Sequence, residues 1–254
     1  MIRAKEVVRL RVIRNDIVVK ERLCSGNTLT SYFRDRWATE VTYTEEAYLV
    51  PYINYMKLYS YGYEVAGATV STGNFTVDYA GKKLTMVKSV TVNYTGDITD
   101  LGLGNLYGGT YNEVTKVGIT PPISVTAGDT VEITYEATFS LSASELGGVL
   151  SDASVYDIEL LSRLLDRLSN RAYKSMTVLK VTLASPEGAV LTLNTANDTA
   201  NKRIVVPSTT LTTPVELKEI VMLAPDLTSL FRFVKATATS MPAGSVFSLS
   251  VKVE

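Results

Sequence analysis

The sequence predicts a mainly β protein built from two tandem β-sandwich (jelly-roll or Ig-like) domains, each with a short accessory helix. Three observations support this fold class. Runs that alternate apolar and polar residues recur along most of the chain, whereas two shorter stretches follow a helical period. An Ala-Gly pair also precedes an alternating run twice, in "SVTAGDTVEITYEATF" (124–139) and "TSMPAGSVFSLSVKVE" (239–254).

The first predicted domain covers residues 1–143 and opens with a hairpin. In "KEVVRLRVIR" (5–14) apolar residues alternate with charged ones, and "RND" (14–16) has turn chemistry. We therefore expect "IVVKERL" (17–23) to return antiparallel to the first run. From about 48 to 139 the signal is again β, with Gly, Asn and Asp between runs that are rich in Tyr, Val and Thr.

A short helix is expected between the hairpin and the later strands. The segment "SGNTLTSYFRDRWATE" (25–40) changes to a helical period, and Ser25 or Asn27 is the candidate N-cap. The apolar residues at this spacing are Leu29, Tyr32, Phe33 and Trp37. We therefore predict one accessory helix in the first domain.

The second predicted domain covers residues 144–254 and contains the clearest helix. In "DIELLSRLLDRLSNRAYK" (157–174) an apolar stripe recurs at helical spacing, and Asp157 is expected at the N-cap or in the first turn. The β signal then resumes and continues to the last residues. The stripe consists of Ile158, Leu161, Leu164, Leu165 and Leu168, while Arg163, Asp166 and Arg167 lie largely off it.

The two predicted domains correspond in the order of their features. Each helix precedes an extended segment, "YINYMKLYS" (52–60) in the first domain and "MTVLKVTLAS" (176–185) in the second. An acidic residue before an apolar pair follows in "ITDLGL" (98–103) and in "LKEIVM" (217–222). Each domain then closes with the Ala-Gly turn and a final strand. We interpret this agreement as a tandem duplication of one unit.

Five segments match a pattern that consists of a helix start, an inner strand and a closing hairpin. In the first domain they are "SGNTLTSYF" (25–33), "ITDLGLGN" (98–105) and "ITPPISVTAGDTVEITYEATF" (119–139); in the second they are "LKEIVML" (217–223) and "MPAGSVFSLSVKVE" (241–254). This pattern resembles the structural proteins of tailed-phage and related virus particles, which are found in necks, tails and fibres. The resemblance covers most of the chain, and it implies a virion component with a β-sandwich fold and no catalytic residues.

The composition excludes several kinds of site. The 254 residues have a formal net charge of −1, lack histidine and glutamine, and include Cys24 as the single cysteine. An internal disulfide, a cysteine metal cluster and the Ser-His-Asp and Cys-His arrangements are therefore excluded. No apolar run reaches the roughly 20 residues that span a bilayer, and the N-terminus lacks the apolar core of a signal peptide. The missing glutamine and scarce cysteine suit a thermophile.

The candidate interface residues are Arg9, Arg11, Tyr55, Tyr59 and Tyr61. The first 37 residues hold nine Lys or Arg and four acidic residues, so the hairpin that carries the arginines allows a weak contact with nucleic acid or an acidic partner. A solvated hairpin face is the favoured alternative. Seven tyrosines fall between positions 43 and 63, and this density suits a core, an interface or a sugar-stacking surface.

No catalytic, cofactor-binding or metal-binding residue is predicted. The segment "GLGNLYGG" (102–109) is one residue longer than the dinucleotide fingerprint and no helix follows it, so its glycines are assigned to a β connection. The carboxylate pairs Asp97/Asp100 and Glu132/Glu136 are the only basis for a glycosidase, and a solvated strand would carry such pairs as well.

The expected function is that of a non-enzymatic structural subunit of a virus particle, located in the virion as a capsid, neck or tail component. Such a subunit acts through symmetric self-assembly into a homo-oligomer and through contacts with other virion proteins, with no membrane partner and no cofactor. The alternative is a carbohydrate-binding or cell-surface adhesion module, with the tyrosines as its sugar platform. A hydrolase is a third class, which rests on the acidic pairs alone.

Overall fold

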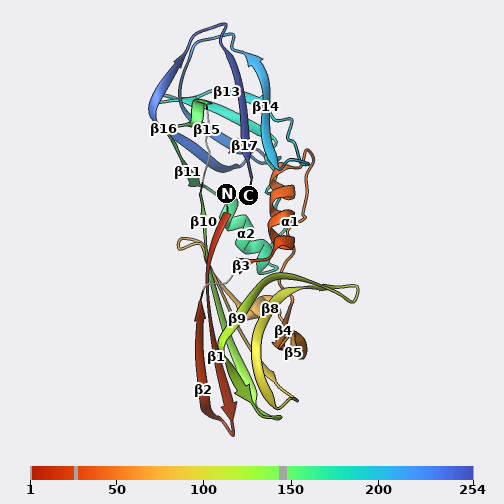
Figure 1. Cartoon of the computed structure of the whole chain (residues 1–254). Coiled ribbons are helices and arrows are strands. Elements are labelled where there is room, and N and C mark those ends of the chain that lie inside the picture. Colours follow the sequence, from red (N-terminus) through yellow and green to blue (C-terminus); the bar gives the residue numbers. More distant parts are fainter. Residues whose placement is uncertain (1, 26–27, 143–147, 254) are drawn as a thin grey trace.

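The computed structural model describes residues 2–25, 28–142 and 148–253. It is mainly β, and its two α-helices and four antiparallel sheets form two β-sandwich halves with one short helix each, which confirms the predicted fold class. Figure 1 shows an elongated molecule with one half at each end and both helices between them. We call this middle region the waist; it consists of the two helices and the connecting segments 43–54 and 169–179.

The lower half in Figure 1 packs sheet A against sheet B. Sheet A has the strand order β2-β1-β10-β7-β6, and sheet B has the order β3-β9-β8-β4-β5. Every second side chain of β10 from Val131 to Phe139 is buried, because alternate residues of a strand point to the facing sheet. The elements are β1 (Ile2–Arg14), β2 (Ile17–Ser25), β3 (Thr28–Leu29), β4 (Tyr55–Ser60), β5 (Tyr63–Thr69), η1 (Thr72–Asn74), β6 (Phe75–Asp78), β7 (Lys83–Thr91), β8 (Gly96–Tyr107), β9 (Thr110–Val125) and β10 (Thr130–Leu141).

The predicted N-terminal hairpin is formed by β1 and β2. Asn15 and Asp16 have positive φ angles of 50° and 64°, as the tight turn between two antiparallel strands requires. Val8, Leu10 and Val12 of β1 point inward and are fully buried. Because β1 also pairs with β10, the hairpin is an integral part of sheet A.

The upper half contains sheets C and D. Sheet C has the strand order β11-β16-β15-β12-β13, and sheet D consists of β14 and β17. The inward side chains Phe247, Leu249 and Val251 of β17 are buried, which gives the last strand the alternation that its sequence predicts. The elements are η2 (Gly148–Leu150), β11 (Ala153–Asp157), β12 (Lys180–Ser185), β13 (Gly188–Asn194), β14 (Arg203–Thr210), β15 (Val215–Leu223), β16 (Ser229–Met241) and β17 (Val246–Lys252).

The first helix, α1, spans Ser31–Thr42. Its N-cap is Thr30, whose hydroxyl accepts a hydrogen bond from the backbone N–H of Phe33 at 3.2 Å. Of the two candidate caps, Ser25 ends β2 instead, and Asn27 lies outside the described residues. The predicted apolar positions divide by depth: Phe33 and Trp37 are fully buried on α1, Tyr32 is half-buried, and Leu29 belongs to β3.

The second helix, α2, spans Leu160–Leu168. The prediction that Asp157 lies at the N-cap or in the first turn is wrong, because the N-cap is Glu159 and Asp157 ends β11; its carboxylate still accepts the backbone N–H of Leu161 at 2.8 Å. The four leucines of the predicted stripe are buried, but Ile158 precedes the helix and is exposed. The sequence places Arg163 and Arg167 off the apolar stripe of α2, yet both side chains are buried. Their guanidinium groups reach polar partners inside the waist, which compensates for the loss of water.

The two halves share a strand order. Read along the chain, β3, α1, β4, β5, β8 and β9 of the lower half correspond to β11, α2, β12, β13, β15 and β16 of the upper half, and sheets B and C list these strands in the same spatial order. Among the described residues, the two strands of sheet D, β14 and β17, correspond to β7 and β10 of sheet A. The predicted domain boundary, between 143 and 144, falls outside the described residues, and the division 1–143 and 144–254 stays a prediction.

The two Ala-Gly turns have the same hydrogen bonds. The N–H of Gly128 bonds to the carbonyl oxygen of Val92 at 2.8 Å, and the N–H of Gly244 bonds to that of Leu211 at 2.8 Å. Both glycines have positive φ angles, 95° and 86°, which L-residues with a Cβ rarely adopt. The sequence repeat therefore corresponds to one repeated turn geometry.

This geometry predicts a matched pair of stability losses. Gly128→Ala and Gly244→Ala should each lower the free energy of unfolding by about 1–2 kcal/mol, because alanine is strained at these positive φ angles. Gly118→Ala is the control, since Gly118 has no such φ and a Cβ there meets nothing within 4 Å. Denaturant unfolding of the three variants tests this, and equal stability of all three would contradict it.

Candidate functional site

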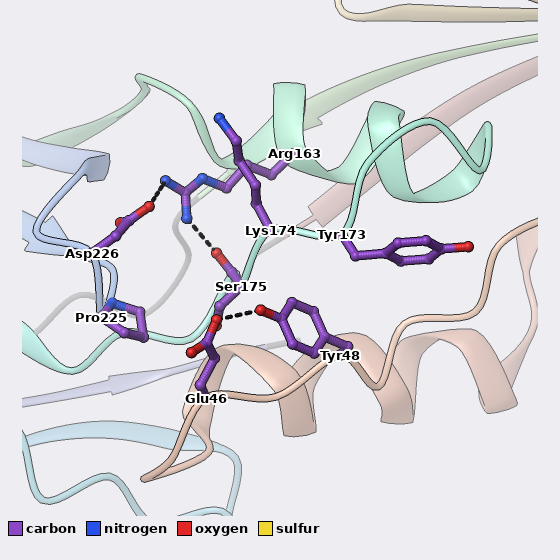
Figure 2. A pocket seen from close by; sticks show the side chains of 8 residues that line it. All are labelled: Glu46, Tyr48, Arg163, Tyr173, Lys174, Ser175, Pro225 and Asp226. Atoms are coloured by element: carbon purple, nitrogen blue, oxygen red, sulfur yellow. Dashed lines mark hydrogen bonds and ion pairs between the residues drawn. The ribbon is translucent and has the colours of Figure 1, made fainter.

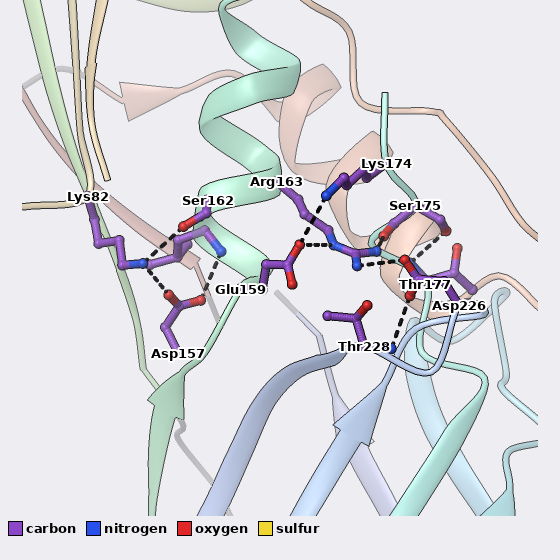
Figure 3. A network of polar contacts seen from close by, with 11 residues as sticks. Lys82, Asp157, Glu159, Ser162, Arg163, Lys174, Ser175, Thr177, Asp226 and Thr228 are labelled. Atoms are coloured by element: carbon purple, nitrogen blue, oxygen red, sulfur yellow. Dashed lines mark hydrogen bonds and ion pairs between the residues drawn. The ribbon is translucent and has the colours of Figure 1, made fainter. Parts of the chain in front are cut away.

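The waist is held by a buried arginine of α2. Arg163 is 2% exposed, and its Nε donates to the Glu159 carboxylate at 3.1 Å. One Nη donates to the carbonyl oxygen of Ser175 at 2.6 Å, and the other donates to the carboxylate of Asp226 at 2.9 Å. Figure 3 shows these partners converging on Arg163 from the helix, from the segment after it and from the β15–β16 turn. A single side chain thus joins three segments of the upper half.

A second buried arginine joins the upper half to the lower one. The guanidinium of Arg167 donates to the carbonyl oxygen of Val50 and, at 2.7 Å, to that of Tyr48. It also lies over the ring of Tyr173, 4.4 Å from the centroid. Because the loop 43–54 leads from α1 into β4, this contact fixes the lower half against α2.

Glu40 is the buried acid of the same region. The backbone N–H of Val50 donates to its carboxylate at 2.6 Å, and the hydroxyl of Thr177 donates to its carbonyl oxygen at 2.8 Å. Burial raises the pKa of Glu40 to about 7, although these backbone N–H groups and the positive charge of Arg167 oppose the shift. The last turn of α1 is therefore bonded to both connecting segments.

The β6–β7 turn reaches α2 from the other side. The ammonium of Lys82 lies 2.9 Å from the carboxylate of Asp157 and donates to the hydroxyl of Ser162 at 3.1 Å (Figure 3). Arg171 donates to the carbonyl oxygen of Phe75 at 2.9 Å. The helix is thus bonded to sheet A as well as to the loop after α1, and the two halves form one connected body.

A cavity of about 270 Å³ opens beside Arg163, and Figure 2 shows the side chains that line it. The lining combines both signs of charge with two tyrosines. Its polar groups bind one another: Arg163 bonds to Asp226, and the hydroxyl of Tyr48 donates to Glu46. The cavity therefore lies in the seam between the connecting segments, with its charges already paired. The lining residues are Glu46, Tyr48, Arg163, Tyr173, Lys174, Ser175, Pro225 and Asp226.

The predicted tyrosines lie on the outer face of sheet B. Tyr55 and Tyr59 of β4 point away from the core and are half-buried, whereas Tyr61, in the β4–β5 turn, is 70% exposed. Tyr55 packs edge-to-face on Tyr111 of β9, with ring centroids 6.2 Å apart. Lys116 lies 4.9 Å from the ring centroid of Tyr59. The structure therefore brings Tyr55 and Tyr59 into one aromatic and cationic cluster, and leaves Tyr61 at its end.

Two glycines lie close to these rings: the sequence assigns Gly102 to a β connection and makes no prediction for Gly67. A Cβ on Gly67 would lie 2.6 Å from the hydroxyl of Tyr55, and one on Gly102 would lie 3.1 Å from the ring of Tyr59. Tyr55 and Tyr59 thus occupy space above these positions that a side chain at either glycine would fill. The signal for this was present, since glycine inside a strand indicates close approach of another group. Burial, together with Glu113, raises the pKa of Tyr59 to about 12.

Arg9 and Arg11 lie on the outer face of sheet A, away from the tyrosines. Arg11 pairs with Glu132 at 3.2 Å and with Glu21 at 3.5 Å, and Arg9 pairs with Glu21 at 3.5 Å. Acidic side chains of β2 and β10 thus compensate the basic excess of β1. The proposed contact with nucleic acid stays a prediction.

Sequence reasoning missed an apolar strip on β2. Ile17, Val18, Val19 and Leu23 are 65%, 42%, 44% and 61% exposed, which is unusual for large apolar side chains gathered on one strand. They lie on the same hairpin as the predicted Arg9 and Arg11. The signal was the segment "IVVKERL" itself, which carries more apolar residues than one buried face can use.

Two further properties concern only the described parts of the chain. Neither helix there is long and apolar enough to cross a membrane. Within the same residues, no three or more Cys, Asp or Glu side chains gather in a way that could hold a metal ion.

Glu40 predicts a pH dependence of stability. Its folded pKa, about 7, lies above the value of about 4.3 expected in the unfolded chain, so the folded state retains a proton that the unfolded state releases. The stabilisation is complete below pH 4 and is lost as the pH rises through 7. We expect wild-type stability to fall relative to Glu40→Gln over this range in denaturant unfolding. Parallel pH profiles of the two proteins would contradict the assignment.

Arg163 predicts a loss of stability that an exposed neighbour does not share. Arg163→Met should lower the free energy of unfolding by about 1–3 kcal/mol, because the carbonyl of Ser175 is left buried without a donor. Lys174→Met is the control, since Lys174 lies beside the same cavity but is mostly exposed. Thermal and denaturant unfolding measure both. Equal losses of stability in the two variants would show that the buried hydrogen bonds of Arg163 do not stabilise the waist more than an exposed lysine does.

Comparison with known proteins adds no family to this description. No protein-family model, no curated protein and no solved structure matches the chain. The surfaces described above therefore carry the functional argument.

Proposed function

We propose that this protein is a non-enzymatic structural subunit of a virus particle, a capsid, neck or tail component that acts by symmetric self-assembly and by contacts with other virion proteins. The observation that carries the proposal is the apolar strip of β2. Four large apolar side chains are held on the surface of a hairpin that is rigidly paired to β10. Leu23 lies opposite Arg9 and Ile17 lies opposite Arg14, so the side chains of the strip point to both faces of this edge strand. A partner surface that covers either face gains hydrophobic stabilisation.

The repeated architecture supports the same function. Sheets B and C have one strand order, and the two Ala-Gly turns have one set of hydrogen bonds. We interpret the halves as copies of one duplicated unit. Bonding across the waist then makes a single elongated body that presents surfaces at fixed positions, and closed symmetric assemblies require such fixed positions.

The alternative is a carbohydrate-binding or adhesion module. The observation that favours it is the exposure of Tyr61, Tyr63 and Tyr107 at the turns of sheet B, where free aromatic faces suit sugar stacking. Tyr55 and Tyr59 fit this role less well, because their rings already pack on Tyr111 and beside Lys116. Substitutions of the exposed tyrosines therefore test the adhesion module, and substitutions in the β2 strip test the assembly.

The mass of the protein in solution tests the assembly. We expect a discrete oligomer well above the 27.7 kDa of one chain, measured by light scattering after size exclusion. The double variant Ile17→Lys/Leu23→Lys should shift this oligomer toward smaller species, because charge on the strip opposes its burial. The control is Val190→Lys, an apolar residue on β13 that is 41% exposed.

A second measurement separates the alternative. A stable monomer that binds glycans, and loses the binding in Tyr61→Ala or Tyr63→Ala, would contradict the virion proposal and support the adhesion module. An oligomer that is insensitive to the β2 variants would show that the strip is not the contact that builds it.

A further inference from the structure

A cleft of about 600 Å³ opens between the β8–β9 hairpin, α1 and the segment 48–52. We call it the hairpin cleft, and its volume lies in the range of small-molecule sites. Figure 1 shows the hairpin projecting sideways from the lower half, below α1. Hydrogen bonds fix these walls against one another. The side-chain oxygen of Asn54 accepts the N–H of Leu106 at 2.7 Å, and the N–H of Thr30, the N-cap of α1, donates to the carbonyl oxygen of Val114 in β9 at 3.0 Å.

Asn105 of β8 brings an unpaired hydrogen-bond donor to this cleft. It follows Leu101 and Leu103 on the inward face of the strand, and it is 8% exposed. Its amide nitrogen Nδ2 is buried and has no acceptor among the described residues. Because nearly all buried donors of folded proteins are paired, an unpaired amide in the lining of a cleft indicates a hydrogen bond to a bound molecule.

The charged side chains of the lining are all basic. Arg36 of α1 and Arg167 of α2 contribute to it, and none of the described residues that line it is acidic. The guanidinium of Arg36 lies 5.4 Å from the ring centroid of Tyr32, while its acidic neighbour Asp35 pairs with Lys202 instead. Arg167 gives its hydrogen bonds to backbone carbonyl oxygens. Guanidinium groups without a carboxylate beside them favour an anionic ligand.

The cavity beside Arg163 has the opposite arrangement. Its lining includes Glu46 and Asp226, and Asp226 lies 2.9 Å from the guanidinium of Arg163. Tyr48 lines both cavities, so the two are neighbours. The compensated charges beside Arg163 give no preference for an anion, and the uncompensated charges of the hairpin cleft do.

The rest of the lining suits a sugar ring that carries the negative charge. Tyrosine rings offer flat apolar faces against which the C–H groups of a sugar pack. Thr110 and Asn112 of β9 add neutral hydroxyl and amide groups, which bind sugar hydroxyl groups together with Asn105. An inorganic anion would use only the arginines. The tyrosines of the lining are Tyr32, Tyr48, Tyr52 and Tyr107.

We propose that the hairpin cleft binds an acidic sugar, a hexuronate unit whose carboxylate pairs with Arg36, whose hydroxyl groups bond to Asn105 and Asn112, and whose ring packs against the tyrosines. The planar guanidinium matches a carboxylate with two parallel hydrogen bonds, so it distinguishes a uronate from the corresponding neutral hexose. This binding activity goes beyond the proposed function and does not depend on it, because the cleft includes no residue of the β2 strip.

Two matched trisaccharides test the proposal on the full-length chain by isothermal titration calorimetry. One is built of hexuronate units and the other of neutral hexose units with the same linkage, so that they differ in the carboxylates. We expect the uronate to bind about tenfold more tightly or better. Arg36→Met should remove this preference. Arg34→Met should keep it, since Arg34 is an exposed arginine of the same helix that does not line the cleft.

Asn105→Asp tests the cleft from its other wall. The substitution keeps the size of the side chain but replaces the unpaired donor with a carboxylate oxygen, which repels the uronate. We expect it to weaken the uronate more than the neutral trisaccharide. Thermal unfolding without ligand shows whether each variant retains the fold.

No binding of either trisaccharide, equal affinity for the two, or a uronate preference that survives in Arg36→Met would overturn the proposal. Equal competition by inorganic phosphate or by a nucleoside monophosphate at the same concentration would also overturn it, in favour of a general anion site or a nucleotide site. Tyr61 does not line the cleft, so uronate binding that is lost in Tyr61→Ala would assign it to the turns of sheet B instead. None of these outcomes involves the oligomer mass, so each leaves the proposed self-assembly standing.

Discussion

The burial of two arginines in the waist is the interaction on which the rest of the structure depends. Among the described residues the two halves share no strand pairing, so they are held by the apolar face of α2 and by polar bonds across the waist, of which those of Arg167 are fully inside it. Each guanidinium has five N–H donors in one plane, and it can satisfy several buried carbonyl or carboxylate groups at once. Because an incomplete buried network is unfavourable, Arg163 fixes α2 within the upper half, and Arg167 fixes the lower half against α2.

This fixed orientation determines where the exposed surfaces of the two halves lie. The apolar strip belongs to the lower half, and the bonded waist fixes its position relative to the upper half. A rigid body of this kind suits the proposed self-assembly. The tyrosine face of sheet B is a further surface, where Tyr55 and Tyr59 occupy space left by glycines of β5 and β8.

The periodic features were predictable because they depend on neighbours in sequence. The N-terminal hairpin, both helices and the closing strands follow from alternation, helical spacing and turn chemistry, each of which acts within a few residues. The positions of Tyr55 and Tyr59 on one face of β4 follow from the same alternation. The burial of Arg163 and Arg167 was not predictable, since arginine on a helix usually indicates exposure. The partners of Arg167 lie in the loop 43–54, more than 100 residues earlier in the chain.

The sequence by itself determined the fold class, the two Ala-Gly turns and the order of the repeated elements, because backbone conformation and side-chain alternation are local properties. Only the tertiary structure decided which charges are buried and which apolar residues stay outside. Those outcomes depend on which distant segments meet: Val50 and Tyr48 accept the bonds of Arg167, and β1 pairs with β10 in sheet A. A residue's solvent exposure is a property of the packed molecule, and no local pattern contains it.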